Sequence, residues 1–331
     1  MKNKNKLIIV LVLIIILVVI FAFYKANVLK TSNQNTQLKE ITIAEFGEVF
    51  LYAPLYIAQD KGFFNEEGLD VKIIPTGGDE KTFAALLSGD AQFGVADPTF
   101  VAISGEKGQP GKVISSILNG VPFWGVAKNK NISEITQPSE LGNYSVATFP
   151  SPATAYVLQE KMFKDGGLKP NIKETAFGSL LASLESGRVD IALELEPNVS
   201  LAVKNGNKIV YSLSSYYPDF AMTGVTALPE YLKENPEVAQ KVVSSIQKSL
   251  DYIRNNPEDS AKILVERFPD VNIDVAKNAI ANMIKSNVFP VTTNISEEAW
   301  NSATELRKNI GDLKSDAPYS SYVITSEFLK K

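Results

Sequence analysis

The sequence predicts an α/β protein of two lobes that follows an N-terminal transmembrane helix. Strand-like and helix-like stretches alternate from residue 41 to about residue 215, as in sheets covered by helices. The alternation restarts near Pro138, and two blocks of similar size indicate two lobes rather than one sheet. From Pro229 onward the pattern is almost entirely helical, with apolar residues recurring on one helical face between Val238 and Ile253.

Short apolar stretches, glycines and prolines set the expected order of elements. In the first block we expect strands at 41–44, 71–74, 93–96, 113–118 and 124–128, and helices at 54–61 and 82–88. In the second block we expect strands at 144–148, 172–175, 189–195 and 209–213, and helices at 151–164, 179–186 and 197–204. Ligands of open α/β sheets bind beyond the carboxyl ends of the strands, so the loops at those ends are the candidate site.

The N-terminus predicts a membrane anchor. Lys2, Lys4 and Lys6 precede an uncharged run from Leu7 to Phe23, which favours a cytoplasmic N-terminus and export of the rest. The run is short for a membrane span and long for the apolar part of a signal peptide. Because no A-x-A cleavage site follows, we favour an uncleaved anchor at residues 1–24 over a cleaved signal. Residues 25–40 are polar and read as a linker.

Composition excludes several kinds of chemistry. The chain has no cysteine, which rules out a lipid anchor on an N-terminal cysteine, disulfides and thiolate catalysis. It has no histidine, which rules out Ser-His-Asp triads and histidine-ligated metals. No calcium-loop pattern occurs, so we expect neither a metal nor a cofactor. The net charge of the whole chain is −4 although five lysines precede residue 37, so the part of the chain after those lysines is more acidic than the whole. An acidic domain argues against nucleic acid as a partner.

Six segments, taken in order, resemble a known family. PLYIAQDKGFF from Pro54 and EEGLDVKII resemble its first helix and second strand, and ALLSGDAQFGVAD, which ends at Asp97, resembles a strand with a ligand-facing loop. PSELGNYSVAT from Pro138 and ASLESGRVDIALELEP resemble the entry and the last helix–strand pair of the second lobe. ENPEVAQKVVSSIQKSLDYIRNNPEDSAKIL from Glu234 resembles the C-terminal helices that pack back on the first lobe. The chain thus resembles solute-binding proteins of ABC importers, in the group that binds nitrate, sulfonates, taurine and thiamine precursors.

The resemblance implies a two-lobed type II periplasmic-binding-protein fold. Lobe 1 is then residues 41–130 plus 224–331, and lobe 2 is residues 131–223. A small organic solute lies between the lobes, which close over it about two crossing segments. The resemblance further implies a monomeric, non-enzymatic receptor in the cell membrane. Its binding domain is extracytoplasmic, and its partners are ABC permease subunits with a cytoplasmic ATPase.

Residues at the carboxyl ends of the expected strands are the candidate ligand-binding set. The 149–154 segment joins a strand to a helix N-terminus, where free N–H groups can hold a polar ligand, or it is an ordinary Ser-Pro cap. Asp97 either bonds the ligand or caps the next helix, and Glu196 is either a ligand contact or a structural partner at the hinge. The full set is Phe46, Tyr52, Thr76, Gly77, Gly78, Asp97, Trp124, Ser151, Thr154 and Glu196.

Arginine bears on the ligand's charge. The four arginines are Arg188, Arg254, Arg267 and Arg307, and we expect none of them in the cleft. Arginine is the usual bidentate partner of sulfonate or carboxylate, so its absence beside several carboxylates favours a neutral or amine-bearing heterocycle. An anion held by helix N-termini is the alternative.

Two other functions fit the same fold. One is an enzyme of thiamine or menaquinone precursor metabolism. One related enzyme makes a thiamine pyrimidine by consuming its own histidine, and this chain has no histidine. Another related class dehydrates a menaquinone precursor in the cytoplasm, whereas the N-terminal segment of this chain predicts export. The other function is a tethered ligand-sensing domain. Neighbouring genes for a permease and an ATPase favour the receptor, and a neighbouring two-component kinase favours the sensor.

Overall fold

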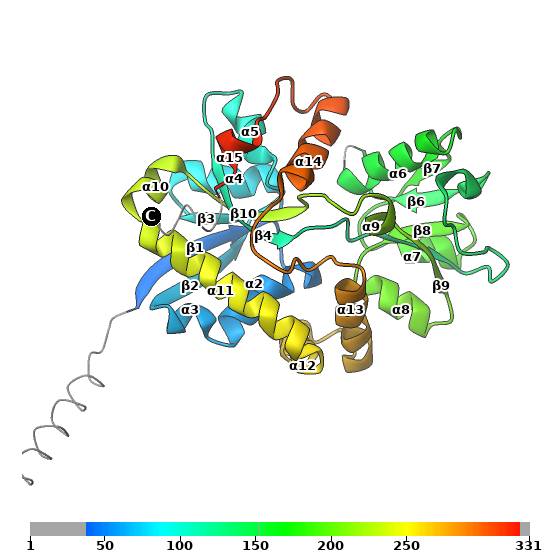
Figure 1. Ribbon diagram of the computed structural model, residues 1–331. Helices are drawn as coiled ribbons and strands as arrows, with labels where there is room; N and C mark the ends of the chain where they lie inside the picture. Colours follow the sequence, from blue (N-terminus) through cyan, green and yellow to red (C-terminus); the bar gives the residue numbers. More distant parts are fainter. Residues whose placement is uncertain (1–37, 152, 325–331) are drawn as a thin grey trace, which may run out of the picture. The chain divides into compact units, whose positions relative to one another are not determined.

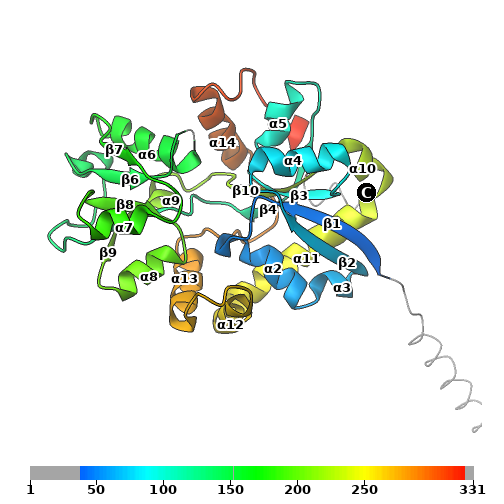
Figure 2. The same cartoon turned by 180° about the vertical axis from the view of Figure 1, so that it is seen from behind.

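A computed structural model describes residues 38–151 and 153–324. These residues form a mixed α/β fold with two five-stranded sheets, which confirms the predicted two-sheet architecture (Figures 1 and 2). The predicted anchor at residues 1–24 and nearly all of the predicted linker lie outside the described residues. Within the described ranges, no helix combines the length and apolar character needed to cross a membrane.

The first sheet has the strand order β2-β1-β3-β10-β4. Strand β1 runs parallel to β3, whereas β10 runs antiparallel to both of its neighbours. Its strands are β1 (Lys39–Glu45), β2 (Leu69–Pro75), β3 (Phe93–Ala96), β4 (Lys112–Leu118) and β10 (Thr223–Ala227). The helices between them are η1 (Phe50–Tyr52), α2 (Ala53–Asp60), α3 (Phe63–Glu66), α4 (Asp79–Ser88) and α5 (Phe100–Gly105).

The second sheet has the order β7-β6-β8-β5-β9. Strand β6 runs parallel to β7 and β8, and β5 runs antiparallel to β8 and β9. Its strands are β5 (Trp124–Ala127), β6 (Val146–Thr148), β7 (Ile172–Glu174), β8 (Ile191–Glu194) and β9 (Lys208–Ser212). Its helices are η2 (Pro138–Leu141), α6 (Thr154–Asp165), α7 (Leu180–Glu185), α8 (Asn198–Lys204) and α9 (Leu213–Tyr216).

Within the described residues the chain crosses between the sheets twice, between β4 and β5 and between β9 and β10. The first crossing, at residues 119–123, comes earlier than the sequence predicted, so β5 belongs to the second sheet although the range predicted for lobe 1, 41–130, includes it. Gly120 and Pro122 interrupt the strand pattern there. The polar run at 128–138 is instead a loop beside the second sheet, where Ile135 N donates to Val210 O at 2.7 Å. At the second crossing, β10 already begins at Thr223, which was predicted as the end of lobe 2.

The C-terminal helices contact both sheets' layers. They are α10 (Pro229–Glu234), α11 (Pro236–Asn255), α12 (Pro257–Arg267), α13 (Ile273–Lys285), α14 (Glu297–Asn309) and α15 (Tyr319–Tyr322). Helix α11 packs on α2, α3 and β4 through its apolar face, where Val242 and Ile246 are fully buried. Burial of each such side chain contributes about 1.5–3 kcal/mol. Helix α13 packs on both α12 and α8, so it links the helices of the first sheet to a helix of the second (Figure 1).

Gly125 in β5 lets the ring of Tyr211 on the neighbouring strand β9 lie close to the backbone, and a substitution at this glycine tests the packing of the second sheet. A Cβ at this position would lie 2.1 Å from Cε1 of Tyr211 on the neighbouring strand. The Tyr211 ring is buried and its hydroxyl donates to Gln159 Oε1 at 2.6 Å, so the ring has little room to move. We expect Gly125→Ala to lower the free energy of unfolding in urea by about 1–3 kcal/mol, the usual cost of overpacking.

Gly47→Ala is the matched control for that substitution. Nothing lies within 4 Å of the Cβ that it adds, so we expect almost no change in its free energy of unfolding. Equal unfolding midpoints for the two variants would contradict the packing of β5 against β9.

Candidate functional site

A cleft of about 440 Å³ lies between loops of the two sheets. The loops after β1 and β3 and the start of α4 come from the first sheet, and the loops after β6 and β7 come from the second. Helix α14 and the segment after it close one side. The lining residues are Phe46, Val49, Leu51, Tyr52, Asp79, Asp97, Phe100, Leu118, Phe123, Phe149, Pro150, Ala153, Thr154, Ala155, Phe177, Leu195, Met222, Thr223, Arg307 and Asp312.

Aromatic side chains make up much of the cleft wall. On the second-sheet side Phe149 stacks on Phe177 with ring centroids 5.5 Å apart, and it meets Phe123 edge-on at 6.2 Å. Phe177 is 66% exposed, and Phe46, on the first-sheet side, is 38% exposed. Exposed aromatic faces in a concave, largely apolar site suit a flat organic ligand.

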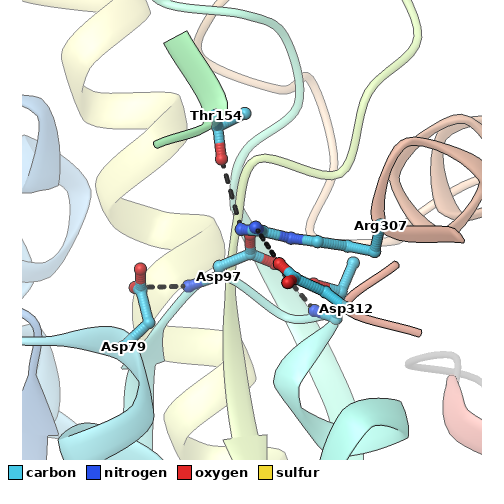
Figure 3. A network of polar contacts seen from close by, with 6 residues as sticks. Asp79, Asp97, Thr154, Arg307 and Asp312 are labelled. Carbon is cyan, nitrogen blue, oxygen red and sulfur yellow. Dashed lines mark hydrogen bonds and ion pairs between the residues drawn. The ribbon is translucent and has the colours of Figure 1, made fainter. Parts of the chain in front are cut away.

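Arg307 forms the polar centre of the cleft (Figure 3). From α14, its Nη2 donates to the carboxylate of Asp97 and to Thr154 Oγ1 at 3.2 Å, and its Nη1 donates to Asp312 Oδ2 at 3.1 Å. Burial alone would lower the pKa of Arg307, but the carboxylate of Asp97, aided by Asp312, raises it above its ordinary value. The guanidinium therefore stays charged and joins the loop after β3, the start of α6 and the end of α14.

Asp79 and Asp97 are linked to each other (Figure 3). The backbone N–H of Asp97 donates to Asp79 Oδ1 at 3.0 Å. Asp97 Oδ1 accepts from Thr99 N at 2.8 Å and from Thr99 Oγ1 at 2.6 Å, so it caps the turn into α5 while Oδ2 holds Arg307. Burial, followed by the negative charge of Asp97, raises the pKa of Asp79 to about 6. The first turn of α4 thus presents a carboxylate to the cleft.

Two further carboxylates are buried at the ends of strands near the cleft. Glu45 ends β1 and accepts a hydrogen bond from Tyr56 Oη at 2.8 Å, and burial raises its pKa to about 7. Glu194 ends β8 and accepts from Asn198 Nδ2 at 3.3 Å, and burial raises its pKa to about 7. Neither carboxylate lines the cleft, so both bear on stability rather than on ligand contact.

Four of the ten residues predicted from the sequence line the cleft together: Phe46, Tyr52, Asp97 and Thr154. They come from the three segments that follow the carboxyl ends of β1, β3 and β6, and Tyr52 ends η1 while Thr154 begins α6. Their contact with a ligand stays a prediction.

The structure places two other predicted groups in their own loops, outside the cleft lining. Thr76 closes the turn after β2, since its hydroxyl donates to Glu45 O at 2.9 Å, and Gly77 takes the positive φ of 81° that this turn requires. Gly78 is the N-cap of α4. Ser151 is exposed, and its N–H donates to Glu174 Oε2; because α6 begins at Thr154, Ser151 is not the cap that the sequence predicted.

Trp124 and Glu196 have structural contacts instead. Trp124 is 1% exposed within β5, and its indole Nε1 donates to Ser286 Oγ at 3.3 Å. Glu196 is fully buried and accepts from Ser200 N and Oγ, each at 3.0 Å, and from Asn282 Nδ2 of α13 at 2.7 Å. Glu196 therefore joins α8 to α13, which is the structural alternative considered for it from the sequence.

The sequence did not single out Arg307, Asp79, Asp312 or Phe177, all of which line the cleft. The expectation that no arginine lies in the cleft was wrong for Arg307. A basic residue in the last turn of a helix, and an acidic one in the first, are ordinary partners of the helix dipole, so neither position signalled a site. Arg307 and Asp97 lie 210 residues apart in the sequence, and the fold brings them together. No local sequence pattern therefore predicted their contact.

A family model described as "NMT1/THI5 like" matches residues 50–260 of the chain. YtlA of Bacillus subtilis, named as a candidate binding protein, is 26% identical over 305 residues, covering 89% of this chain and 90% of YtlA. The 4-amino-5-hydroxymethyl-2-methylpyrimidine phosphate synthase THI13 of Saccharomyces cerevisiae is 24% identical, covering 68% of this chain and 70% of THI13. The formylaminopyrimidine-binding protein of Halalkalibacterium halodurans is 23% identical, covering 77% and 73%.

Solved structures of binding proteins share the fold. The ligand-binding component of an ABC-type import system from Staphylococcus aureus superposes with a TM-score of 0.68 at 19% identity, covering 88% of this chain and 98% of that one. The periplasmic aliphatic sulphonate binding protein SsuA from Escherichia coli superposes with a TM-score of 0.69 at 14% identity, covering 88% and 99%. At these identities the likeness establishes the periplasmic-binding type of fold.

Buried Glu194 gives a pH dependence of stability. Because its pKa is raised from 4.5 to about 7 in the folded state, the folded chain keeps a proton that the unfolded chain releases. Stability therefore falls as pH rises between about 4.5 and 7, by at most about 3 kcal/mol for this group. We expect Glu194→Gln, which cannot ionise, to reduce the fall in unfolding free energy measured in urea from pH 5 to pH 8.

Glu266→Gln removes an exposed carboxylate on α12 and is the control. It should keep the pH dependence of the parent chain. A Glu194→Gln profile that runs parallel to the parent profile would contradict burial as the cause.

Proposed function

The chain belongs to the NMT1/THI5 like family, and on that premise we propose that it is the solute-binding component of an ABC importer. It captures a small organic solute between its two lobes. The observation that carries the proposal is the cleft of about 440 Å³, whose exposed aromatic residues, Phe46 and Phe177, come from loops of different sheets. Movement of one sheet relative to the other about the crossings at 119–123 and 213–222 then buries the solute.

The proposal includes a place for the protein in the cell. Residues 1–24 anchor the chain in the cell membrane and residues 25–40 link the anchor to an extracytoplasmic binding domain. The run from Leu7 to Phe23 behind three lysines supports this orientation. As a monomer the protein passes its solute to permease subunits that are driven by a cytoplasmic ATPase. The names of YtlA and of the Staphylococcus aureus protein support this kind of role.

The cleft favours an uncharged or amine-bearing ring as the solute. Its lining is mostly apolar, and its charged lining residues are Asp79, Asp97 and Asp312 against Arg307. An excess of carboxylates disfavours sulfonate or nitrate, whose charge has the same sign. Two relatives are named for pyrimidines, which are rings of this kind.

An enzymatic role on this fold is the competing proposal, because THI13 is named as a synthase. Chemistry that consumes the enzyme's own histidine is closed to a chain without histidine. The cleft offers carboxylates, an arginine and aromatic rings, which are sufficient for binding. Solute binding is therefore the function that we propose, in preference to catalysis.

A ligand screen on the full-length chain tests the proposal. We expect one or more ring compounds, from a panel of pyrimidines, flavins, sulfonates and nitrate, to raise the thermal midpoint. A solute at 100 times its Kd adds about 2.7 kcal/mol of stability. A folded, monomeric chain that responds to no solute in the panel would contradict the receptor function.

Calorimetry on the compound selected by the screen then tests the cleft itself. Phe177→Ala removes an exposed ring of the cleft wall, and a lost aromatic contact of about 0.5–1.5 kcal/mol predicts an affinity about two- to tenfold weaker. Val291→Ala, at an exposed apolar residue between α13 and α14 that does not line the cleft, should leave the affinity unchanged. Equal affinities for the two variants would place the solute elsewhere.

A further inference from the structure

The charged groups of the cleft are an arginine paired with two aspartates, and a third aspartate, Asp79, outside that cluster. Arg307 is 7% exposed and donates to Asp97 and Asp312 through both of its terminal nitrogens. Because the two carboxylates already outweigh one guanidinium, an incoming anion must displace one of them or accept repulsion from both. Arg307 therefore fastens three segments of the chain around the cleft and does not serve as an anion receptor.

Asp79 is the aspartate outside that cluster. Its Oδ1 accepts from the backbone N–H of Asp97, and within residues 38–151 and 153–324 no group donates a hydrogen bond to its Oδ2. Asp79 lines the cleft, as do Tyr52 and Phe46, and Figure 3 shows its carboxylate at the backbone of Asp97. A half-buried carboxylate oxygen that lacks a donor is stabilised by an N–H group of a ligand, and hydrogen bonds to charged groups contribute about 1.5–3 kcal/mol.

We propose that Asp79 is the specificity-determining residue of the cleft, and that it accepts a hydrogen bond from an amino or ammonium group on a ring ligand. Asp97 and Asp312 complete the selection by keeping Arg307 from binding anions. This inference rests on the receptor function proposed above and names the chemical class of its solute. It assigns opposite roles to the aspartates: one contacts the solute, and two hold an arginine.

The apolar walls set the orientation of such a ligand. Phe149 and Phe177 contribute stacked rings from the second sheet, while Asp79 belongs to the first turn of α4 on the first-sheet side. A ring held against the phenylalanines can therefore direct an exocyclic amine toward Asp79. At that edge the amine meets Asp79, which forms no ion pair within the described residues, whereas Arg307 pairs with both Asp97 and Asp312.

Matched probes and variants test the proposal by calorimetry on the full-length chain at pH 7.5, where Asp79, with a pKa of about 6, is ionised. The probes are 4-aminopyrimidine, 4-methylpyrimidine and pyrimidine-4-carboxylate, which share a ring and differ in donor and charge. We expect the parent chain to bind the amine at least tenfold more tightly than the other two. Asp79→Asn should lose most of that preference. Glu80→Gln, the same loss of charge at the next, exposed residue of α4, should keep it.

A second variant tests the role given to the other two aspartates. Asp97→Asn combined with Asp312→Asn frees Arg307, and we expect its affinity for pyrimidine-4-carboxylate to rise at least tenfold. If loss of the cap at Asp97 prevents folding, Asp312→Asn alone should give a smaller rise of the same sign. Unfolding curves of all variants separate lost binding from lost structure.

Three results would overturn the proposal. They are tighter binding of the carboxylate than of the amine by the parent chain, an Asp79→Asn variant that keeps the full amine preference, or no binding of the amine at all. If the solute screen yields a ligand of another class, none of these results contradicts the proposed receptor function. A screen without any ligand removes the receptor function itself, so the two failures are distinguishable.

Discussion

The charged contact between Arg307 and its two aspartates is the constraint on which the cleft depends. A guanidinium with 7% exposure needs opposite charges, and it finds them at Asp97, after β3, and at Asp312, just beyond its own helix. Its further bond to Thr154 reaches the start of α6, which belongs to the second sheet. One side chain therefore joins both sheets and the C-terminal helices around the cleft. Removal of one of its charged partners would leave an unpaired buried charge, a change that usually lowers the free energy of unfolding by about 3–5 kcal/mol.

The fold explains why this contact lies where a ligand can enter. Each sheet presents carboxyl ends of parallel strands to the cleft, and in the part of the chain that the structure describes, the strand order passes between the sheets at 119–123 and 213–222. These two short crossings connect the sheets, and many loops meet at the edge between them. Side chains of these loops line the space at that edge without filling it. Glu196, buried between α8 and α13, holds the opposite side of the junction through Asn282. The same arrangement is the one that the proposed closure of the cleft requires.

The order and type of most elements could be predicted from the sequence, because apolar period, glycine stops and Pro starts are local signals. Strand β3 matches its predicted bounds at Phe93–Ala96. Two predicted residues that line the cleft, Phe46 and Thr154, followed from the rule that ligands bind beyond the carboxyl ends of strands. Trp124 and Glu196 did not, because strand alternation gives two faces without saying which one meets the cleft. Arg307 could not be found locally, since its partner Asp97 lies 210 residues away.

Solute-driven approach of the two sheets is the central claim, and the distance between two spin labels tests it most directly. The chain has no cysteine, so cysteines placed at exposed Ser88 on α4 and exposed Lys173 on β7 can be labelled without background. Saturation with the solute should shift the distance distribution, measured by pulsed electron spin resonance, to shorter values. A distribution that is unchanged when calorimetry shows the site to be full would contradict closure of the cleft.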